Sequence, residues 1–334
     1  MPMKLLDGER DWLTQVTSDL PNDLLKLVYA DWLDERGEET RAQFLRAFVE
    51  AAIKMKLKAF PPVRGLDEEW LDLIGYRLLK GAAKAGQADL REPLRRLARP
   101  ALRIVASKRT FIPQVAPLGA SKIGGNPDLP PNFEWPTGDT CRATYNDPTA
   151  GETRLAGFVA QINLAEIAHT QAARDLPKSG LLSFFCFQDW ENDNPDKVGV
   201  RCAFIRDTTK LVGTPPPTPL TTGNEALFVQ SLTFLETLDI PYPTSGPWNG
   251  EYGVSIVYDS PTYNAIRELQ SANFENMLGY GRATTGGDPT PDKDHRHLIF
   301  LRSKGTEGLH IQIHQDDLRA ANFDAIKLAW VDFD

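Results

Sequence analysis

The sequence predicts an α+β protein with a small all-helical N-terminal domain followed by a larger mixed domain. Apolar residues at helical spacing fill roughly the first 86 positions, and short apolar runs bounded by Gly and Pro dominate from about residue 102. The length of 334 residues also exceeds the usual size of one domain. We therefore expect domains at residues 1–86 and 87–334.

Four segments of the N-terminal part have the apolar period of a packed helix. They are residues 7–18, 23–36, 39–59 and 67–83. Asn22 is placed to cap the second helix, and Gly37 is placed to end it in the left-handed conformation. A further short helix is expected at residues 87–98, before a strand at 102–105.

Asp31 lies within the most apolar of these helices, next to Trp32. A buried aspartate needs a partner, so the simplest interpretation is a structural ion pair with Arg41 or Arg46. The alternative is that Asp31 and Trp32 face a binding partner, and we keep both residues as candidate binding residues.

The segments Leu27–Gly37 (LVYADWLDERG) and Arg41–Arg46 (RAQFLR) are distinctive. They resemble the bacterial repeat-companion domain, a small helical module found beside many unrelated domains. The resemblance covers about residues 8–50. It implies a modular bacterial protein and carries no assigned chemistry.

The second domain contains an ordered series of motifs. These are Ser121–Pro127 (SKIGGNP), Phe158–Leu164 (FVAQINL), Leu176–Phe185 (LPKSGLLSFF), Leu278–Tyr280 and Asp316–Phe323. The series resembles the YwqG-like family, a bacterial domain of unknown function, over about residues 88–334. The resemblance implies an α+β fold and no established activity. The chain departs from the family pattern between Leu301 and Leu309, where a Trp-Gly-Asp turn is usual.

Two stretches of the second domain are similar to each other. Gln161–Ile167 aligns with Gln312–Leu318, and each follows an apolar strand and opens a short helical segment. A genuine duplication would place Gln161 and Gln312 in equivalent positions, lining a shared cleft. The alternative is chance similarity between two strand-to-helix connections.

Four of the five histidines lie between positions 295 and 314. Residues 298–301 and 309–313 predict a hairpin, in which strand alternation places His310, Gln312 and His314 on one face. Pairing would bring His297 near His314, and Asp316 or Asp317 could complete a zinc site. The alternative is a polar face that carries ordinary surface histidines.

The charge balance and cysteine content restrict the classes of function. The formal net charge of −8 argues against nucleic-acid binding. The acidic excess follows the first hundred or so residues, which suits a basic partner or plain solubility. Three cysteines without a C-x-x-C spacing predict reduced thiols. With no apolar run of ~20 residues, we expect a cytoplasmic protein that does not associate with membranes.

The sequence contains no G-x-S-x-G elbow and no cysteine in a recognisable catalytic context. We therefore expect a protein-binding or adaptor module without a cofactor, which neutralises or scaffolds a basic partner. The alternative is a metal-dependent hydrolase that uses zinc or another divalent ion bound in the region His295–His314.

Overall fold

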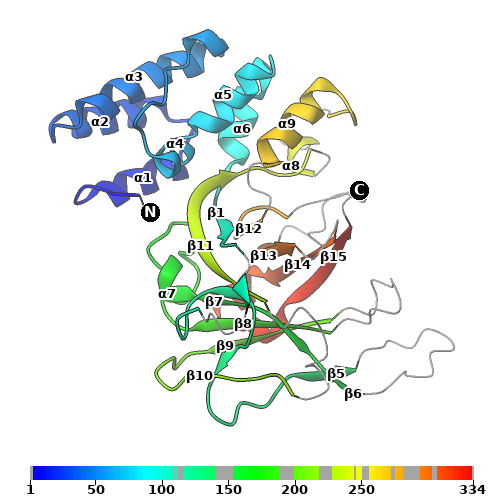
Figure 1. The fold of residues 1–334 in the computed structure, drawn as a ribbon. Helices are drawn as coiled ribbons and strands as arrows, with labels where there is room; N and C mark the ends of the chain where they lie inside the picture. Colours follow the sequence, from blue (N-terminus) through cyan, green and yellow to red (C-terminus); the bar gives the residue numbers. More distant parts are fainter. Residues whose placement is uncertain are drawn as a thin grey trace. The chain divides into compact units, whose positions relative to one another are not determined.

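In the computed structural model the chain forms two compact units (Figure 1). The residues described are 3–108, 110–111, 116–139, 153–187, 199–217, 228–243, 246–249, 256–271, 275–281, 294–302 and 307–332. The helical unit comprises residues 1–103 and 235–289, and the sheet unit comprises residues 104–234 and 290–334. An N-terminal helical region followed by antiparallel strands with short helices confirms the predicted α+β class.

The helical unit begins with a series of short helices. They are α1 (Glu9–Ser18), α2 (Asp23–Asp34), α3 (Glu39–Lys54), η1 (Leu57–Ala59), α4 (Glu68–Leu73), α5 (Tyr76–Lys84), η2 (Ala88–Leu90) and α6 (Arg91–Leu97). The side chain of Asn22 accepts a hydrogen bond from the amide of Leu25, so the predicted cap of α2 is confirmed. Gly37 has φ 78°, which confirms the predicted left-handed end. No helix in the described ranges is both long and apolar enough to cross a bilayer.

Two predicted helices differ from the observed ones. The helix expected at residues 67–83 is divided into α4 and α5, because Gly75 adopts φ 84° between them. The helix expected to reach residue 59 ends at Lys54, where Met55 takes the left-handed conformation with φ 46°. Glycine enters this region freely, whereas a methionine there is uncommon and requires support from packing.

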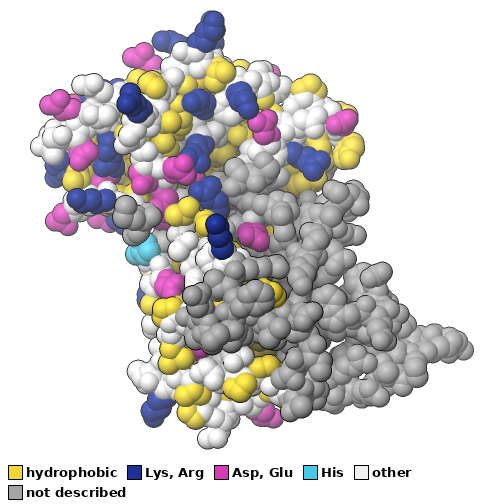
Figure 2. Space-filling view, viewed as in Figure 1, with side chains coloured by type: hydrophobic (Ala, Val, Ile, Leu, Met, Phe, Trp, Pro, Cys, Tyr) yellow, Lys and Arg dark blue, Asp and Glu magenta, His cyan; other side chains and the backbone are white. Residues whose placement is uncertain are grey.

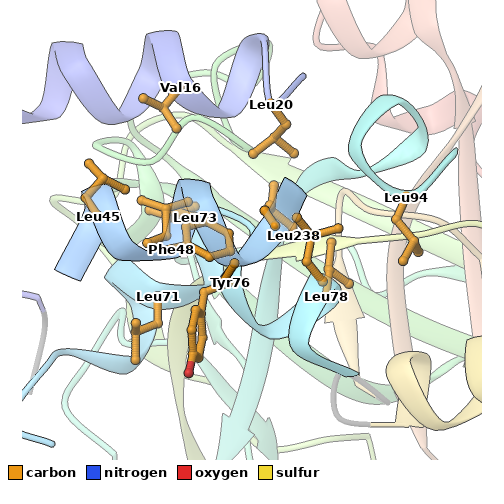
Figure 3. Packing of buried hydrophobic residues seen from close by; sticks show 14 of the residues in the cluster. Val16, Leu20, Leu45, Phe48, Leu71, Leu73, Tyr76, Leu78, Leu94 and Leu238 are labelled. Carbon is orange, nitrogen blue, oxygen red and sulfur yellow. The ribbon is translucent and has the colours of Figure 1, made fainter. Parts of the chain in front are cut away.

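The core of the helical unit contains residues from both of its chain segments. Aliphatic side chains of the N-terminal helices pack around Trp70, Tyr29 and Tyr76. Leu238 and Trp248 from the second segment join the same cluster. Figure 3 shows Leu238 among the leucines of the first segment. The second segment supplies the end of β11 (Phe228–Asp239), α8 (Gly246–Asn249), α9 (Pro261–Ser271) and β12 (Asn276–Met277). The helical unit therefore includes residues on both sides of the predicted boundary after residue 86.

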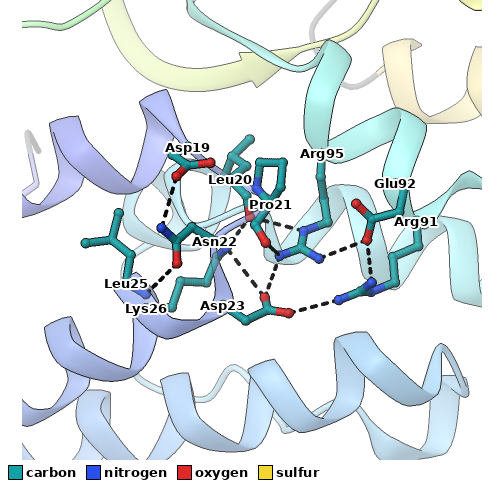
Figure 4. Close-up of polar contacts among 10 residues, drawn as sticks. All are labelled: Asp19, Leu20, Pro21, Asn22, Asp23, Leu25, Lys26, Arg91, Glu92 and Arg95. Carbon is teal, nitrogen blue, oxygen red and sulfur yellow. Dashed lines mark hydrogen bonds and ion pairs between the residues drawn. The ribbon is translucent and has the colours of Figure 1, made fainter. Parts of the chain in front are cut away.

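A buried polar cluster joins α6 to the start of α2 (Figure 4). Arg95 Nε donates to the carbonyl of Leu20 at 3.1 Å, and Arg91 Nη2 lies 2.9 Å from Asp23 Oδ2. Lys26 Nζ also donates to the carbonyl of Leu20, and burial lowers the pKa of this lysine to about 8. These basic side chains are therefore engaged in holding two helices together.

The sheet unit consists of antiparallel strands. They are β1 (Arg99–Ala106), β2 (Thr110–Phe111), β3 (Lys122–Gly124), β4 (Asp128–Leu129), β5 (Thr137–Asp139), β6 (Thr153–Leu155), β7 (Gly157–Asn163), β8 (Leu181–Phe187), β9 (Gly199–Ile205), β10 (Val212–Gly213), β13 (His295–Arg302), β14 (Glu307–His314) and β15 (Lys327–Asp332), with β1 and β11 shared between the two units. One set pairs in the order β11-β3-β7-β8-β9, and a second in the order β13-β14-β15. The short helices α7 (Leu164–Ile167), α10 (Gln315–Arg319) and η6 (Phe323–Ala325) connect strands.

Aromatic side chains organise the interior of the sheet unit. Phe185 of β8 packs against Trp135 and Phe158 with ring centroids 5.4 and 5.7 Å apart. The ring of Phe204 in β9 packs against that of Phe323 in η6, with ring centroids 5.1 Å apart. This contact joins the two sets of strands. Cys186 is a free thiol of this interior, as predicted, and burial raises its pKa to about 12.

Candidate functional site

A buried ionic group occupies the first half of the sheet unit. Lys122 of β3 and Asp128 of β4 lie 2.9 Å apart, Nζ to Oδ1. Gln161 of β7 donates from Nε2 to Asp128 Oδ2 at 2.7 Å and accepts from the backbone amide of Asp128 at 2.9 Å. All three side chains are almost completely buried. The predicted binding residue Gln161 is therefore sealed inside a hydrogen-bonded network.

The glycines of the first motif explain how this group forms. β3 ends at Gly124, and Gly124 and Gly125 adopt φ 70° and 69°. This left-handed pair reverses the chain and brings Asp128 back beside Lys122. A Cβ on Gly125 would also lie 3.3 Å from the Cβ of Val229, so the turn packs closely on β11.

The remaining bonds of the group are also satisfied. Asp128 Oδ2 accepts from the amide of Gly119 at 2.8 Å, and Gln161 Nε2 donates to the carbonyl of Ala120 at 2.8 Å. This arrangement fixes the segment 119–128 against β7.

The histidines form two pairs across the β13–β14 hairpin. His310 Nε2 and His297 Nδ1 are 2.5 Å apart, and Gln312 Nε2 lies 3.3 Å from His310 Nδ1. His295 is the strand partner of His314, and their rings are 5.4 Å apart. The expected contact of His297 with His314 is therefore replaced by one with His310. The register explains the change, because His314 lies opposite His295 while His297 lies opposite Gln312.

The histidines are not ordinary surface residues. His297 and His310 are buried, and Gln312 is buried beside them. β14 is covered on both faces, because Ile311 and Ile313 on the face opposite His310 are also buried. The alternative of a polar face with ordinary surface histidines was therefore wrong for His297 and His310.

The nitrogens of His297 and His310 face each other at 2.5 Å. Two nitrogens bound to one tetrahedral zinc ion would lie roughly 3.3 Å apart. His314 Nδ1 accepts from the backbone amide of Asp316 at 3.3 Å and lies 3.7 Å from its carboxylate. Over the described ranges, no group of three or more His, Cys, Asp or Glu side chains is arranged to hold a metal ion. The zinc site remains a prediction, which metal analysis of the purified protein would test.

The structure places the two glutamines in matching surroundings. Strand pairing sets Gln161 opposite Lys122 and Gln312 opposite His297. Two residues beyond each glutamine, a side chain caps the following helix: Asn163 for α7 and His314 for α10. This repeated strand-to-helix pattern supports a duplication. Gln161 and Gln312 are each almost fully buried, so neither lines an open cleft.

Asp31 is exposed on α2, whereas Trp32 is half-buried and its ring centroid lies 6.1 Å from those of Trp12 and Tyr29. Arg46 bonds Asp31 Oδ1 and Asp34 Oδ2, each at 2.7 Å, which confirms the expected ion pair through Arg46. The guanidinium of Arg36 stacks 4.0 Å from the centre of the Trp32 ring. Asp31 is exposed, so both expected roles, ion pairing and facing a partner, are open to it.

A groove in the helical unit was not anticipated from the sequence. Its volume is about 350 Å³. Its lining comes from α4, α5, β11 and α9, including Leu71, Asp72, Tyr76, Arg77, Lys80, Lys84, Thr237, Leu238, Ala265, Glu268 and Leu269. The sequence signal is the helical spacing of Arg77, Lys80 and Lys84, which places them along one side of α5. The other wall lies more than 150 residues away, so no local pattern could reveal the groove.

Asp72 is the buried carboxyl group of this groove. Arg77 Nε lies 3.1 Å from its Oδ1, and Thr237 Oγ1 donates to its Oδ2 at 3.2 Å. Burial raises the pKa of Asp72 to about 6, although the guanidinium groups of Arg77 and Arg103 oppose the shift. A carboxyl with such a pKa exchanges its proton close to neutral pH.

We expect the stability of the helical unit to fall as Asp72 ionises. Because the pKa is higher in the folded than in the unfolded chain, the contribution of Asp72 is fully present below about pH 4 and is lost as the pH rises through about 6. Integrating the shift gives a loss of about 3 kcal/mol. Asp72→Asn removes this dependence, so urea unfolding at pH 4 and pH 7.5 should show the variant gaining about 3 kcal/mol relative to the natural chain.

The exposed Asp89 provides the control for this measurement. Asp89→Asn should change stability by the same small amount at both pH values. Equal effects of Asp72→Asn at pH 4 and pH 7.5 would contradict the raised pKa.

The comparisons with known proteins concern mainly the second part of the chain. The model of the family described as "Domain of unknown function (DUF1963)" matches residues 121–331. This range contains Lys122, Asp128 and Gln161 of the buried ionic group and all four clustered histidines. A search of curated proteins found no match. The match covers more than half of the sequence, and the chain therefore belongs to the DUF1963 family.

Proposed function

We propose that this protein is a binding module that recognises a protein partner through the outer face of α2 and α3. The observation that carries the proposal is a group of large aliphatic side chains left in solvent on this hairpin. Leu24 is 70% exposed and Ile53 is 64% exposed, with Val28 also exposed. Contiguous exposed apolar surface with a polar rim is typical of protein-binding sites.

The ion pair between Asp31 and Arg46 shows how α2 and α3 are aligned with each other. α2 and α3 are joined by a short connection and pack side by side in opposite directions (Figure 1). Leu24 lies seven residues before Asp31, and Ile53 lies seven residues after Arg46. Seven residues are two helical turns, which return to the same face. Leu24 and Ile53 therefore lie level with each other, two helical turns from the ion pair and on the same face.

The polar rim gives this surface its specificity. Asp31 and Arg46 offer one charge of each sign, and Arg36 and Trp32 offer a stacked cation and ring. Figure 2 shows basic, acidic and hydrophobic side chains interspersed on the face that it draws. The fitting partner is an amphipathic helix that buries its apolar side chains on Leu24 and Ile53 and pairs its own charges with the rim.

The charge distribution bears on the expected basic partner. The helical unit has 20 Lys and Arg against 24 Asp and Glu, and the sheet unit has 17 against 21. The acidic excess is therefore the same in both units and singles out neither as the site for a basic partner. We keep a basic partner as a proposal that rests on overall charge alone.

The finer family assignments support the same role. We propose that the DUF1963 part is of the YwqG-like type and that residues 8–50 form a repeat-companion domain of a bacterial, cytoplasmic protein. The capped α2–α3 hairpin supports the second assignment, and the buried free thiols support a reducing compartment.

Substitutions on the hairpin test the docking surface. Leu24→Asp with Ile53→Asp should reduce the captured amount of a stoichiometric partner at least tenfold in pull-downs from native extract, because a charge would be buried at the contact. Leu118→Asp is the matched control, since Leu118 is 61% exposed and belongs to the sheet unit. Quantitative mass spectrometry measures the ratio of partner to bait.

The outcomes of this experiment separate the alternatives. The same partner recovered equally with both sets of variants would exclude the hairpin as the docking surface. Loss of self-association in light scattering, with no other protein recovered, would identify a second copy of the chain as the occupant.

A further inference from the structure

We infer that the groove between α5 and α9 binds an amphiphilic anion, an apolar chain that ends in one negatively charged group. The groove lies entirely within the helical unit and shares no residue with the proposed docking surface on α2 and α3. Its volume of about 350 Å³ is at the lower end of the range for small-molecule sites. It therefore fits a single short chain and not a bulky cofactor.

Apolar side chains form the interior of the groove. Leu71, Leu78 and Leu238 are buried in the core, and Ala265 and Leu269 of α9 form the facing wall. α5 and α9 approach closely where Gly81 faces Leu269, because a Cβ on Gly81 would lie 2.3 Å from Leu269 Cδ2. The walls therefore offer an apolar ligand direct contact with aliphatic carbon.

Cations predominate among the charged side chains that line the groove. Arg77, Lys80 and Lys84 line it from α5, whereas the lining acids are Asp72 and Glu268. Lys84 Nζ lies 2.9 Å from Glu268 Oε1, and both groups are largely exposed, so this pair contributes little to stability. The lining thus carries one more positive than negative group.

Lys80 is the cation best placed to receive an anion. Arg77 is held by Asp72 at 3.1 Å and by Glu68 at 3.3 Å. Lys80 Nζ lies 5.2 Å from the centre of the Tyr76 ring, and the ion pairs recorded among the described residues do not include it. An ammonium on an aromatic face beside an apolar groove can pair with the head group of a ligand whose tail lies on the leucines.

Titration calorimetry of the full chain with decanoate tests this inference. Decan-1-ol and decyltrimethylammonium provide the same apolar chain with a neutral and a positive head. We expect saturable 1:1 binding of decanoate at least about tenfold tighter than that of decan-1-ol, and still weaker binding of the cation. Equal affinities for decanoate and decan-1-ol, or no saturable binding of decanoate, would overturn the proposal.

Variants locate the head and the tail of the ligand. Lys80→Gln should weaken decanoate about tenfold and leave decan-1-ol unchanged, whereas Lys80→Arg should keep decanoate binding. Lys56→Gln is the control, since Lys56 is exposed and outside the lining. Ala265→Phe should fill the groove and weaken both ligands, with Ala265→Leu as the milder change if the first fails to fold. Unchanged decanoate binding in both the Lys80→Gln variant and a folded Ala265 variant would place the ligand elsewhere and refute the inference.

Discussion

Replacing Lys122 by Met is expected to lower the free energy of unfolding of the sheet unit by about 3–5 kcal/mol. Lys122 and Asp128 are 1% and 2% exposed, so water cannot solvate the carboxylate that would remain. The methionine fills much of the lysine volume, which limits the contribution of a cavity. The loss therefore reports the uncompensated charge of Asp128.

Hydrogen exchange in increasing urea measures this effect on peptides from β7 and β8. Lys210→Met provides the control, because Lys210 is an exposed lysine of the same unit. The double change Lys122→Met with Asp128→Asn should be more stable than Lys122→Met alone, since the unpaired charge is then absent. A loss in Lys122→Met no larger than that in Lys210→Met would show that the ion pair does not hold the segment 119–128.

Replacing Glu9 by Ala is expected to lower the free energy of unfolding of the helical unit by about 3–5 kcal/mol. Glu9 is fully buried and accepts from Tyr29 Oη at 2.5 Å, from the amide of Leu6 at 2.8 Å and from both terminal nitrogens of Arg41. Tyr29 Oη in turn accepts from Trp70 Nε1 at 2.9 Å. Removing one carboxylate therefore takes the acceptor from Tyr29 of α2, from Arg41 of α3 and from the amide of Leu6 ahead of α1.

The pKa of Tyr29 also reflects the burial of this network. Burial, and then the charge of Glu9, raise the pKa of Tyr29 above its usual value. Glu9→Gln keeps an acceptor and should lose less stability than Glu9→Ala. Glu50→Ala on α3 is the control, because the exposed pair of Glu50 with Lys54 at 3.5 Å contributes little. Urea unfolding that gives equal midpoints for Glu9→Ala and Glu50→Ala would contradict the structural role of the network.

The elements that the sequence predicts well are set by local interactions. Asn22 caps α2 and Gly37 ends it because both effects act within a single turn. The apolar strand expected at residues 102–105 also lies within the observed β1. By contrast, a helical apolar period continues through Gly75, and only the observed φ of 84° shows that α4 and α5 are separate.

The candidate sites were harder to predict because they depend on contacts distant in the sequence. Alternation in β14 places His310 and Gln312 on one face, but it does not tell whether other elements cover that face. The partnership of Lys122 with Asp128 crosses a glycine turn, where neither strand nor helix period applies. Gln161 was identified through the internal similarity, although its partner groups were not.

The helical unit is assembled from two stretches of chain, and this has a consequence for protein synthesis. The interior around Trp70 stays incomplete until Leu238, Trp248 and Ile266 have left the ribosome. The N-terminal helices must therefore wait, with apolar surface uncovered, while more than 130 intervening residues are translated. The first part to be made is thus among the last to close, which creates a period of exposure that chaperones would have to cover in the cell.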